Sequence, residues 1–141
     1  MTRLLLLSAL ALTLALTACD SNDPIVSSCE NESREIAIDT LAVGTSPAVA
    51  DASDRVLINY TGTLEDGSEF DSGSNAAFYL ASTVSGFRQG VTGMRIGGRR
   101  RITVPPYLGY GTQAREDANG DVLIPSCSVL TFDVELLDIL S

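Results

Sequence analysis

The sequence of 141 residues contains no histidine, no lysine and no tryptophan. Without histidine, no serine has an imidazole partner to activate it, and no Gly-x-Ser-x-Gly motif is present either. Without lysine, the phosphate loop of the Gly-x-x-x-x-Gly-Lys type is missing. Zinc is disfavoured as well, because no histidine completes a ligand set. The composition therefore does not support acyl transfer by a Ser/His pair or nucleotide hydrolysis, and we expect neither a metal site nor a cofactor.

Positive charge is scarce, because nine arginines are the only basic residues against 18 aspartates and glutamates. The formal net charge of -9 repels nucleic acid and anionic lipid headgroups at long range. Arg99, Arg100 and Arg101 nevertheless follow one another, and such a run is able to grip a phosphate backbone. In this acidic chain we interpret them as the start of a strand whose exposed positions face acidic side chains such as Asp133 or Glu135. We therefore expect no nucleic-acid partner.

An uncharged apolar run of 15 residues, Leu4 to Ala18, follows Arg3. It is shorter than the ~20 residues that a membrane-spanning helix needs and ends in small residues, so it resembles the apolar core of an export signal. Leu16-Thr17-Ala18-Cys19 resembles the lipobox of bacterial lipoproteins. That resemblance implies a signal peptide of residues 1–18 that is removed and a lipid anchor on Cys19. An uncleaved membrane anchor and an ordinary secretory signal are the alternatives.

These assignments divide the chain into three parts. After the signal peptide, residues 19–34 are polar and acidic without periodicity, as expected of a flexible tether. Residues 35–141 are expected to form a single domain. We expect the protein to be exported and anchored by its lipid to a bacterial membrane, facing the periplasm or the cell exterior.

Cysteine is rare, and lipidation of Cys19 leaves only Cys29 and Cys127. An even pair in an oxidising compartment favours a disulfide over a metal site. A bridge between positions so far apart would restrict the unfolded chain by up to ~4 to 5 kcal/mol. Two free buried thiols are the alternative.

Hydrophobic periodicity predicts an α+β domain with one short helix and four or five antiparallel strands. Asp66-Gly67 is a hairpin-turn signal, and Gly97-Gly98 is expected to stop the helix. Loops are expected at residues 72–75 and 105–127. The strands are expected at 35–43, 55–63, 99–104 and 129–139, with short strand candidates at 68–71 and 78–80, and the helix is expected within 84–94.

The same periodicity predicts which side chains face the core. In the last strand the inward positions alternate with polar ones, and in the helix the apolar positions fall at helical spacing. The predicted core-facing residues are Phe87, Val91, Met94, Ile102, Val104, Leu130, Phe132, Val134 and Leu136.

The segment from Asp117 to Asp121 superficially resembles a calcium-binding loop. A calcium-binding loop that starts at Asp117 needs glycine at position 122 and glutamate at position 128, where this chain has Val122 and Ser128. We interpret the segment as a turn rich in Asp and Asn.

Aromatic residues gather around the expected loops, and four ordered blocks surround them. These blocks are Val56–Gly73, Gly86–Gly98, Arg100–Gly111 and Ile124–Ile139. Together they resemble the FKBP-type peptidyl-prolyl cis-trans isomerases, in the family's order and at near-family spacing, from Glu35 to the C-terminus. The resemblance implies a five-stranded antiparallel sheet wrapped around one short helix, with an apolar pocket between them.

The resemblance also implies a set of site residues. Asp71 and Tyr110 would be the polar, catalytic members, and the backbone N–H of Val84 would bind a substrate carbonyl. Leu123 and Ile124 would lie on a loop that flanks the opening. The pocket itself would be lined by Tyr60, Phe70, Phe87 and Phe132.

The resemblance implies that the protein isomerises X-Pro bonds in proline-containing polypeptides. We expect it to act as a monomer in the folding of exported proteins. Phe87 replaces the tryptophan that most often forms the pocket floor in the family, and Ala76 replaces a larger residue of one wall. These departures keep open an alternative, an FKBP-like chaperone or peptide-binding module with little isomerase activity.

Overall fold

The computed structural model describes Cys29 and residues 33–140. The predicted signal peptide, Cys19 and most of the predicted tether lie outside the described residues. Within them, no helix is long and apolar enough to cross a membrane. The elements are β1 (Ala37–Ala42), β2 (Arg55–Leu64), β3 (Glu69–Tyr79), the 3-10 turn η1 (Leu80–Ser82), α1 (Ser85–Val91), β4 (Arg99–Val104), the 3-10 turn η2 (Pro106–Leu108), β5 (Arg115–Glu116), β6 (Val122–Ile124) and β7 (Leu130–Leu140).

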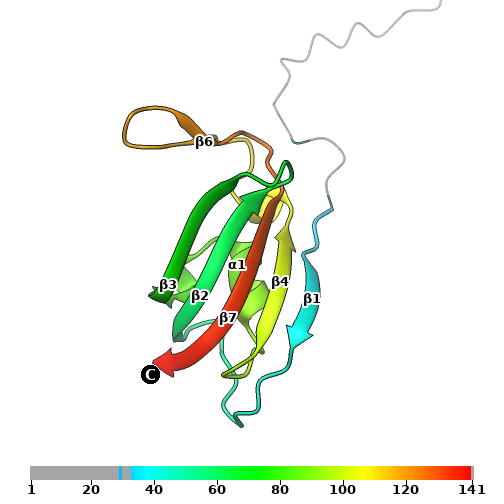
Figure 1. Ribbon diagram of the computed structural model, residues 1–141. Helices are drawn as coiled ribbons and strands as arrows, with labels where there is room; N and C mark the ends of the chain where they lie inside the picture. Colours follow the sequence, from blue (N-terminus) through cyan, green and yellow to red (C-terminus); the bar gives the residue numbers. More distant parts are fainter. Residues whose placement is uncertain (1–28, 30–32, 141) are drawn as a thin grey trace, which may run out of the picture.

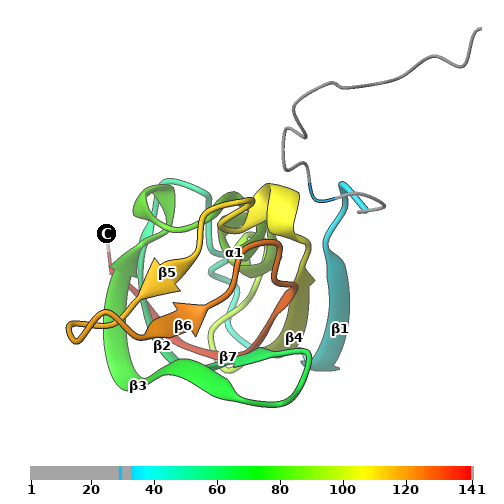
Figure 2. The same cartoon turned by 90° about the horizontal axis from the view of Figure 1, so that it is seen from above.

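Five strands form one antiparallel sheet in the order β1-β4-β7-β2-β3, and β5 pairs with β6 as a separate hairpin. The long last strand β7 lies in the middle of the sheet, between β2 and β4 (Figure 1). Seen from above, the sheet curves around α1, which lies on its concave side (Figure 2). The predicted α+β fold, a five-stranded antiparallel sheet wrapped around one short helix, is confirmed.

The core lies between α1 and the concave face of the sheet, and all nine of the predicted core-facing residues are buried there. The helix approaches the sheet closely because Gly86 and Gly90 face Val104 and Ile102 of β4. A Cβ atom on Gly90 would lie only 2.5 Å from Cγ2 of Ile102. Because Gly86 and Gly90 have no side chains, the helix backbone packs directly against β4.

The prediction of a loop at residues 72–75 was wrong, because β3 continues through them as one strand. Ser72 and Gly73 remain paired with β2, and the register shifts beyond them. Asn75 adopts a positive φ of 52°, and its backbone N–H donates to the Asn59 side chain at 3.0 Å. An irregularity in the ladder thus accommodates turn-forming residues that the sequence pattern assigned to a loop.

The helix is shorter than predicted and ends at Val91 rather than at Gly97-Gly98. Gly93 adopts a φ of +81°, which ends the helical path, and Met94 packs in the core from outside the helix. The guanidinium of Arg100 donates to the carbonyls of Gly90 at 2.7 Å and Thr92 at 3.0 Å. Burial lowers the pKa of Arg100, and the carbonyl oxygens at the helix end replace hydrogen bonds to water that the guanidinium loses there.

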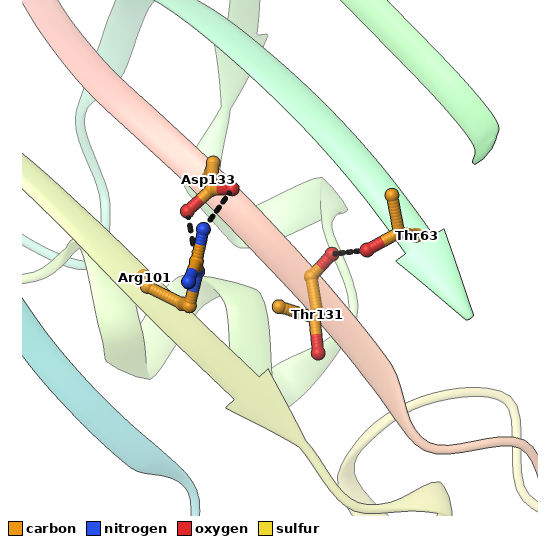
Figure 3. Close-up of polar contacts among 4 residues, drawn as sticks. All are labelled: Thr63, Arg101, Thr131 and Asp133. Carbon is orange, nitrogen blue, oxygen red and sulfur yellow. Dashed lines mark hydrogen bonds and ion pairs between the residues drawn. The ribbon is translucent and has the colours of Figure 1, made fainter. Parts of the chain in front are cut away.

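The prediction that the arginine run begins a strand with exposed positions facing acidic side chains is confirmed at Arg101. Its Nε and Nη2 donate to both carboxylate oxygens of Asp133, at 2.8 and 2.9 Å (Figure 3). On the same face the Thr63 hydroxyl donates to the Thr131 carbonyl at 3.5 Å. Arg100 differs, because strand alternation turns it inward to the end of α1. The run is therefore divided between the sheet surface and the helix.

The segment 105–127 was predicted as a plain loop, and this was wrong, because it contains η2 and the β5–β6 hairpin. The predicted Asp- and Asn-rich turn is confirmed at the hairpin tip. One carboxylate oxygen of Asp117 accepts the N–H groups of Asn119 at 2.8 Å and Asp121 at 3.0 Å. The hairpin projects from the end of the sheet at which β2 ends (Figure 1).

A disulfide joins Cys29 to Cys127, with their Cα atoms 5.4 Å apart. The backbone N–H of Cys127 donates to the Gly111 carbonyl at 2.8 Å, so the bridge ties the chain before β1 to the segment that follows η2. Nearby, the guanidinium of Arg34 lies 5.0 Å from the centre of the Tyr107 ring. The chain before β1 is thus attached to the domain at two points.

Candidate active site

A cavity of about 310 Å³ opens between the N-terminal end of α1 and the concave face of the sheet. This volume lies at the lower end of the range for small-ligand sites. Its walls come from β2, β3, the η1–α1 connection, the η2–β5 segment and β7. The lining residues are Tyr60, Asp71, Phe78, Ser82, Thr83, Val84, Phe87, Tyr110, Arg115 and Phe132.

Three phenylalanine rings form the apolar side of the site. Phe87 from α1 and Phe132 from β7 meet edge to face with ring centres 5.0 Å apart, and Phe70 meets Phe132 in the same way at 5.6 Å. Gly62 of β2 makes this possible, since a Cβ there would lie 2.6 Å from the Phe70 ring. Phe87 and Phe132 are only 5% and 6% exposed. Phe87 and Phe132 therefore give the cavity an almost fully buried apolar side, and the Phe70 ring supports Phe132 by contact.

The opposite wall is polar and is centred on Tyr60 and Asp71. The Tyr60 hydroxyl donates to Oδ2 of Asp71 at 2.7 Å, and its ring meets Phe78 edge to face at 5.4 Å. Burial raises the pKa of Tyr60, and the hydrogen bond and charge of Asp71 raise it further. Tyr60 therefore remains protonated and holds the Asp71 carboxylate in place.

The rim is formed by Tyr110, which lies two residues after the end of η2. The N–H of Gly111 donates to the Pro106 carbonyl at 2.8 Å, and the N–H of Gln113 donates to the Tyr110 carbonyl at 3.2 Å. The guanidinium of Arg115 lies 5.1 Å from the centre of the Tyr110 ring. Backbone bonds on one side and the arginine on the other therefore fix the position of this tyrosine.

Val84 precedes the first residue of α1 and contributes a backbone donor to the cavity. Its carbonyl accepts the N–H of Arg88 at 3.1 Å, whereas its own N–H bonds to no group in the part of the chain that the structure describes. The neighbouring Thr83 is bonded through both its N–H and its hydroxyl to the Leu80 carbonyl, at 3.1 and 2.8 Å. The connection is thus held in place while one N–H remains available to a ligand.

Six of the predicted site residues line this one cavity: Tyr60, Asp71, Val84, Phe87, Tyr110 and Phe132. Phe70 is outside the lining and supports Phe132 by ring contact. Leu123 is 43% exposed on β6, and the Ile124 side chain, 4% exposed, packs in the core. Neither lines the cavity, so their contact with a substrate stays a prediction.

Four lining residues were missing from the predicted site: Phe78, Ser82, Thr83 and Arg115. Phe78 stood out in the sequence only as one of several aromatic residues. Ser82 and Thr83 precede a helix start, which is a common place for small hydroxyl residues. No sequence signal pointed to Arg115, because its place depends on the β5–β6 hairpin. Within the described residues, no group of three or more His, Cys, Asp or Glu side chains is placed to hold a metal ion.

The curved sheet, its helix and the aromatic cavity between them define a small α+β domain. The family model for the FKBP-type peptidyl-prolyl cis-trans isomerases matches residues 46–137. The chain belongs to this family, as its sequence blocks predicted.

Curated relatives agree with this assignment. FK506-binding protein 4 of Aspergillus fumigatus is 41% identical over 113 residues, which are 77% of this chain and 22% of that protein. The isomerase FkpA of Escherichia coli is 41% identical over 91 residues, which are 62% of this chain and 32% of FkpA. The chain therefore spans about a fifth of the length of the fungal relative and about a third of that of FkpA.

Solved structures show the same similarity. The peptidyl-prolyl cis-trans isomerase of Pseudomonas syringae superimposes with a TM-score of 0.67 at 32% identity, over 75% of this chain and 76% of that one. The crystal structure of FkpA from Escherichia coli gives a TM-score of 0.64 at 35% identity, over 74% of this chain and 47% of that one.

Proposed function

We propose that this protein accelerates the cis-trans isomerisation of X-Pro bonds in polypeptides. The observation that carries the proposal is the cavity itself, in which aromatic rings from β2, β3, α1 and β7 face the hydroxyl of Tyr110 and the carboxylate of Asp71. Membership of the isomerase family and the 41% identity to FkpA support it.

The chemistry of the reaction requires such a cavity rather than a nucleophile. Rotation about a peptide bond faces a barrier of ~18 to 20 kcal/mol because the planar amide is stabilised by resonance. The twisted transition state loses that conjugation and part of its charge separation. An apolar cavity that excludes water therefore favours the twisted amide over the solvated planar form. No bond is broken, so the surroundings of the bond provide the catalysis.

Each wall has a role in this proposal. The proline ring packs on Phe87 and Phe132, which meet edge to face on the apolar side of the cavity. The available N–H of Val84 binds a carbonyl of the substrate chain, and the Tyr110 hydroxyl donates to a second carbonyl at the rim. Asp71, held by Tyr60, places a negative charge beside the rotating amide.

The test is a protease-free proline-peptide isomerisation assay with the full chain. Tyr110→Phe and Asp71→Ala are each expected to lower kcat/KM about five- to ten-fold, the effect of losing one hydrogen bond of ~1 to 1.5 kcal/mol. Circular dichroism is expected to show an unchanged fold, because Tyr110→Phe keeps the ring that packs against the core cluster and Asp71 lies outside that cluster.

Two results would contradict this assignment of roles. Loss of the far-UV signal in either variant would make the residue structural. A folded wild-type chain that binds proline peptides but does not accelerate their isomerisation would instead establish the second candidate, a chaperone-like binding module. The observation that favours this candidate is the Phe87 floor, which offers less area than an indole and no indole N–H.

We also propose that the chain is an exported lipoprotein, anchored through Cys19 to a bacterial membrane, where it acts as a monomer on exported polypeptides. The uncharged run before Cys19 and its lipobox-like sequence support this proposal. The disulfide between Cys29 and Cys127 supports it as well, because such bridges persist in oxidising compartments.

Expression of the full chain in Escherichia coli with a radiolabelled fatty acid tests the anchor. The wild-type protein is expected to incorporate the label and to sediment with membranes, and the Cys19→Ser variant is expected to lose both properties. Cys29→Ser is the matched control, because it removes a cysteine outside the lipobox and should leave the label in place. A wild-type chain that is cleaved and unlabelled would show an ordinary secretory signal instead.

A further inference from the structure

Arg115 is the only basic residue that lines the cavity within the part of the chain that the structure describes. It begins β5 and pairs with Ile124 of β6, whose side chain is buried in the core. Its guanidinium lies 5.1 Å from the centre of the Tyr110 ring at the rim. A cationic group is therefore held at the mouth of an apolar site, on a chain whose net charge is -9.

The nearest acidic residues of the hairpin do not neutralise Arg115. Glu116, the next residue of β5, does not line the cavity, and it forms no ion pair with Arg115. The carboxylate of Asp117 is bonded within the hairpin turn. The ion pair that forms within the described residues joins Arg101 to Asp133, on another face of the molecule. The guanidinium donors of Arg115 thus remain available to a ligand.

We propose that Arg115 makes the site selective for polypeptides with an acidic residue next to the isomerised proline. This inference rests on the proposed isomerase function and specifies its substrate class. A carboxylate beside the proline ring meets the planar guanidinium, whose fork of N–H donors matches two carboxylate oxygens. The other charged group of the lining is the Asp71 carboxylate, which accepts a hydrogen bond from Tyr60 at 2.7 Å. The attraction for an acidic side chain is therefore confined to the mouth of the site, where Arg115 lies over Tyr110. A basic neighbour of the proline is disfavoured by the same charge.

Tetrapeptides with Glu, Gln or Lys before or after the proline test this selectivity in the isomerisation assay. For the wild-type chain, kcat/KM is expected to be about five-fold higher for the Glu peptide than for the Gln peptide. This ratio corresponds to the free energy of a partly exposed ion pair. The Lys peptide is expected to have a lower kcat/KM than the Gln peptide. Arg115→Gln should abolish the difference, Arg115→Lys should keep most of it, and raised salt should reduce it.

Arg55→Gln is the matched control. Arg55 also lies over a tyrosine ring, 5.4 Å from the centre of Tyr79, but neither residue lines the cavity. This variant should keep the wild-type preference. If Arg115→Gln lowered kcat/KM equally for all three peptides, the proposal would be overturned, because Arg115 would then only position Tyr110. Equal rates on the three peptides for the wild-type chain would also overturn it.

Binding measurements separate this inference from the proposed function. Fluorescence anisotropy of dye-labelled Glu, Gln and Lys peptides reports the preference even if the chain does not accelerate isomerisation. A five-fold tighter Glu complex that is lost in Arg115→Gln supports the inference whatever the turnover. Isomerisation without any preference in binding or rate overturns the inference and leaves the isomerase function standing.

Discussion

Replacing both Cys29 and Cys127 with serine is expected to lower the free energy of unfolding by about 4 to 5 kcal/mol. The disulfide joins positions 98 residues apart, so its loss allows the unfolded chain far more conformations. Thermal denaturation followed by circular dichroism should show a Tm lower by about 15 °C or more. The bond from the Cys127 N–H to the Gly111 carbonyl and the contact between Arg34 and Tyr107 do not depend on the bridge and should remain.

Reductant provides the control for this prediction. Dithiothreitol should lower the Tm of the wild-type chain to that of the double variant, and the double variant should not respond to it. Equal Tm values for the oxidised and reduced wild-type chain would show that the bridge contributes nothing to stability. Alkylation of both thiols in the unreduced protein would show that the bridge does not form.

Replacing Phe132 is expected to have the second-largest effect, because this ring belongs both to the core and to the cavity floor. Phe132→Ala should cost about 3 to 5 kcal/mol of stability, and Phe132→Leu less than about 1.5 kcal/mol. Both variants lose the edge-to-face contacts with Phe87 and Phe70. Both should therefore lose about ten-fold or more in kcat/KM for proline peptides, a loss of about 1.4 kcal/mol or more.

Leu130→Ala is the matched control for Phe132→Ala. Leu130 lies on the same strand and the same buried face, two residues earlier, but does not line the cavity. It should lose about 2 to 5 kcal/mol of stability and keep its kcat/KM at temperatures where the protein is folded. If Phe132→Leu kept full activity, the aromatic floor would not be required for the reaction.

Much of the fold was predictable because apolar periodicity depends on local backbone geometry. The alternation in β7 predicted its buried face, since every second side chain of a strand points the same way. The length of the helix was not predictable to the same degree. Phe87, Val91 and Met94 have helical spacing, but the chain leaves the helix at Gly93, and Met94 reaches the core from the turn that follows.

The site was predicted in part, and family resemblance was needed for it. The sequence showed that its aromatic residues gather near the expected loops, and the ordered blocks related them to one pocket. The bond from Tyr60 to Asp71 was not predicted, although the two residues are only 11 positions apart, because it depends on the register of β2 with β3. The division of the arginine run between Asp133 and the end of α1 depends likewise on strand neighbours.

By itself the sequence determined the class of domain and the core-facing side of the helix and of the last strand. These properties follow from composition and from the repeat of the backbone. The tertiary structure alone decided that Arg115 lies over Tyr110 at the rim of the cavity, and that Gly62 and Gly90 leave room for a ring and a strand. Such contacts join residues from different elements, so they exist only once the sheet has curved around the helix.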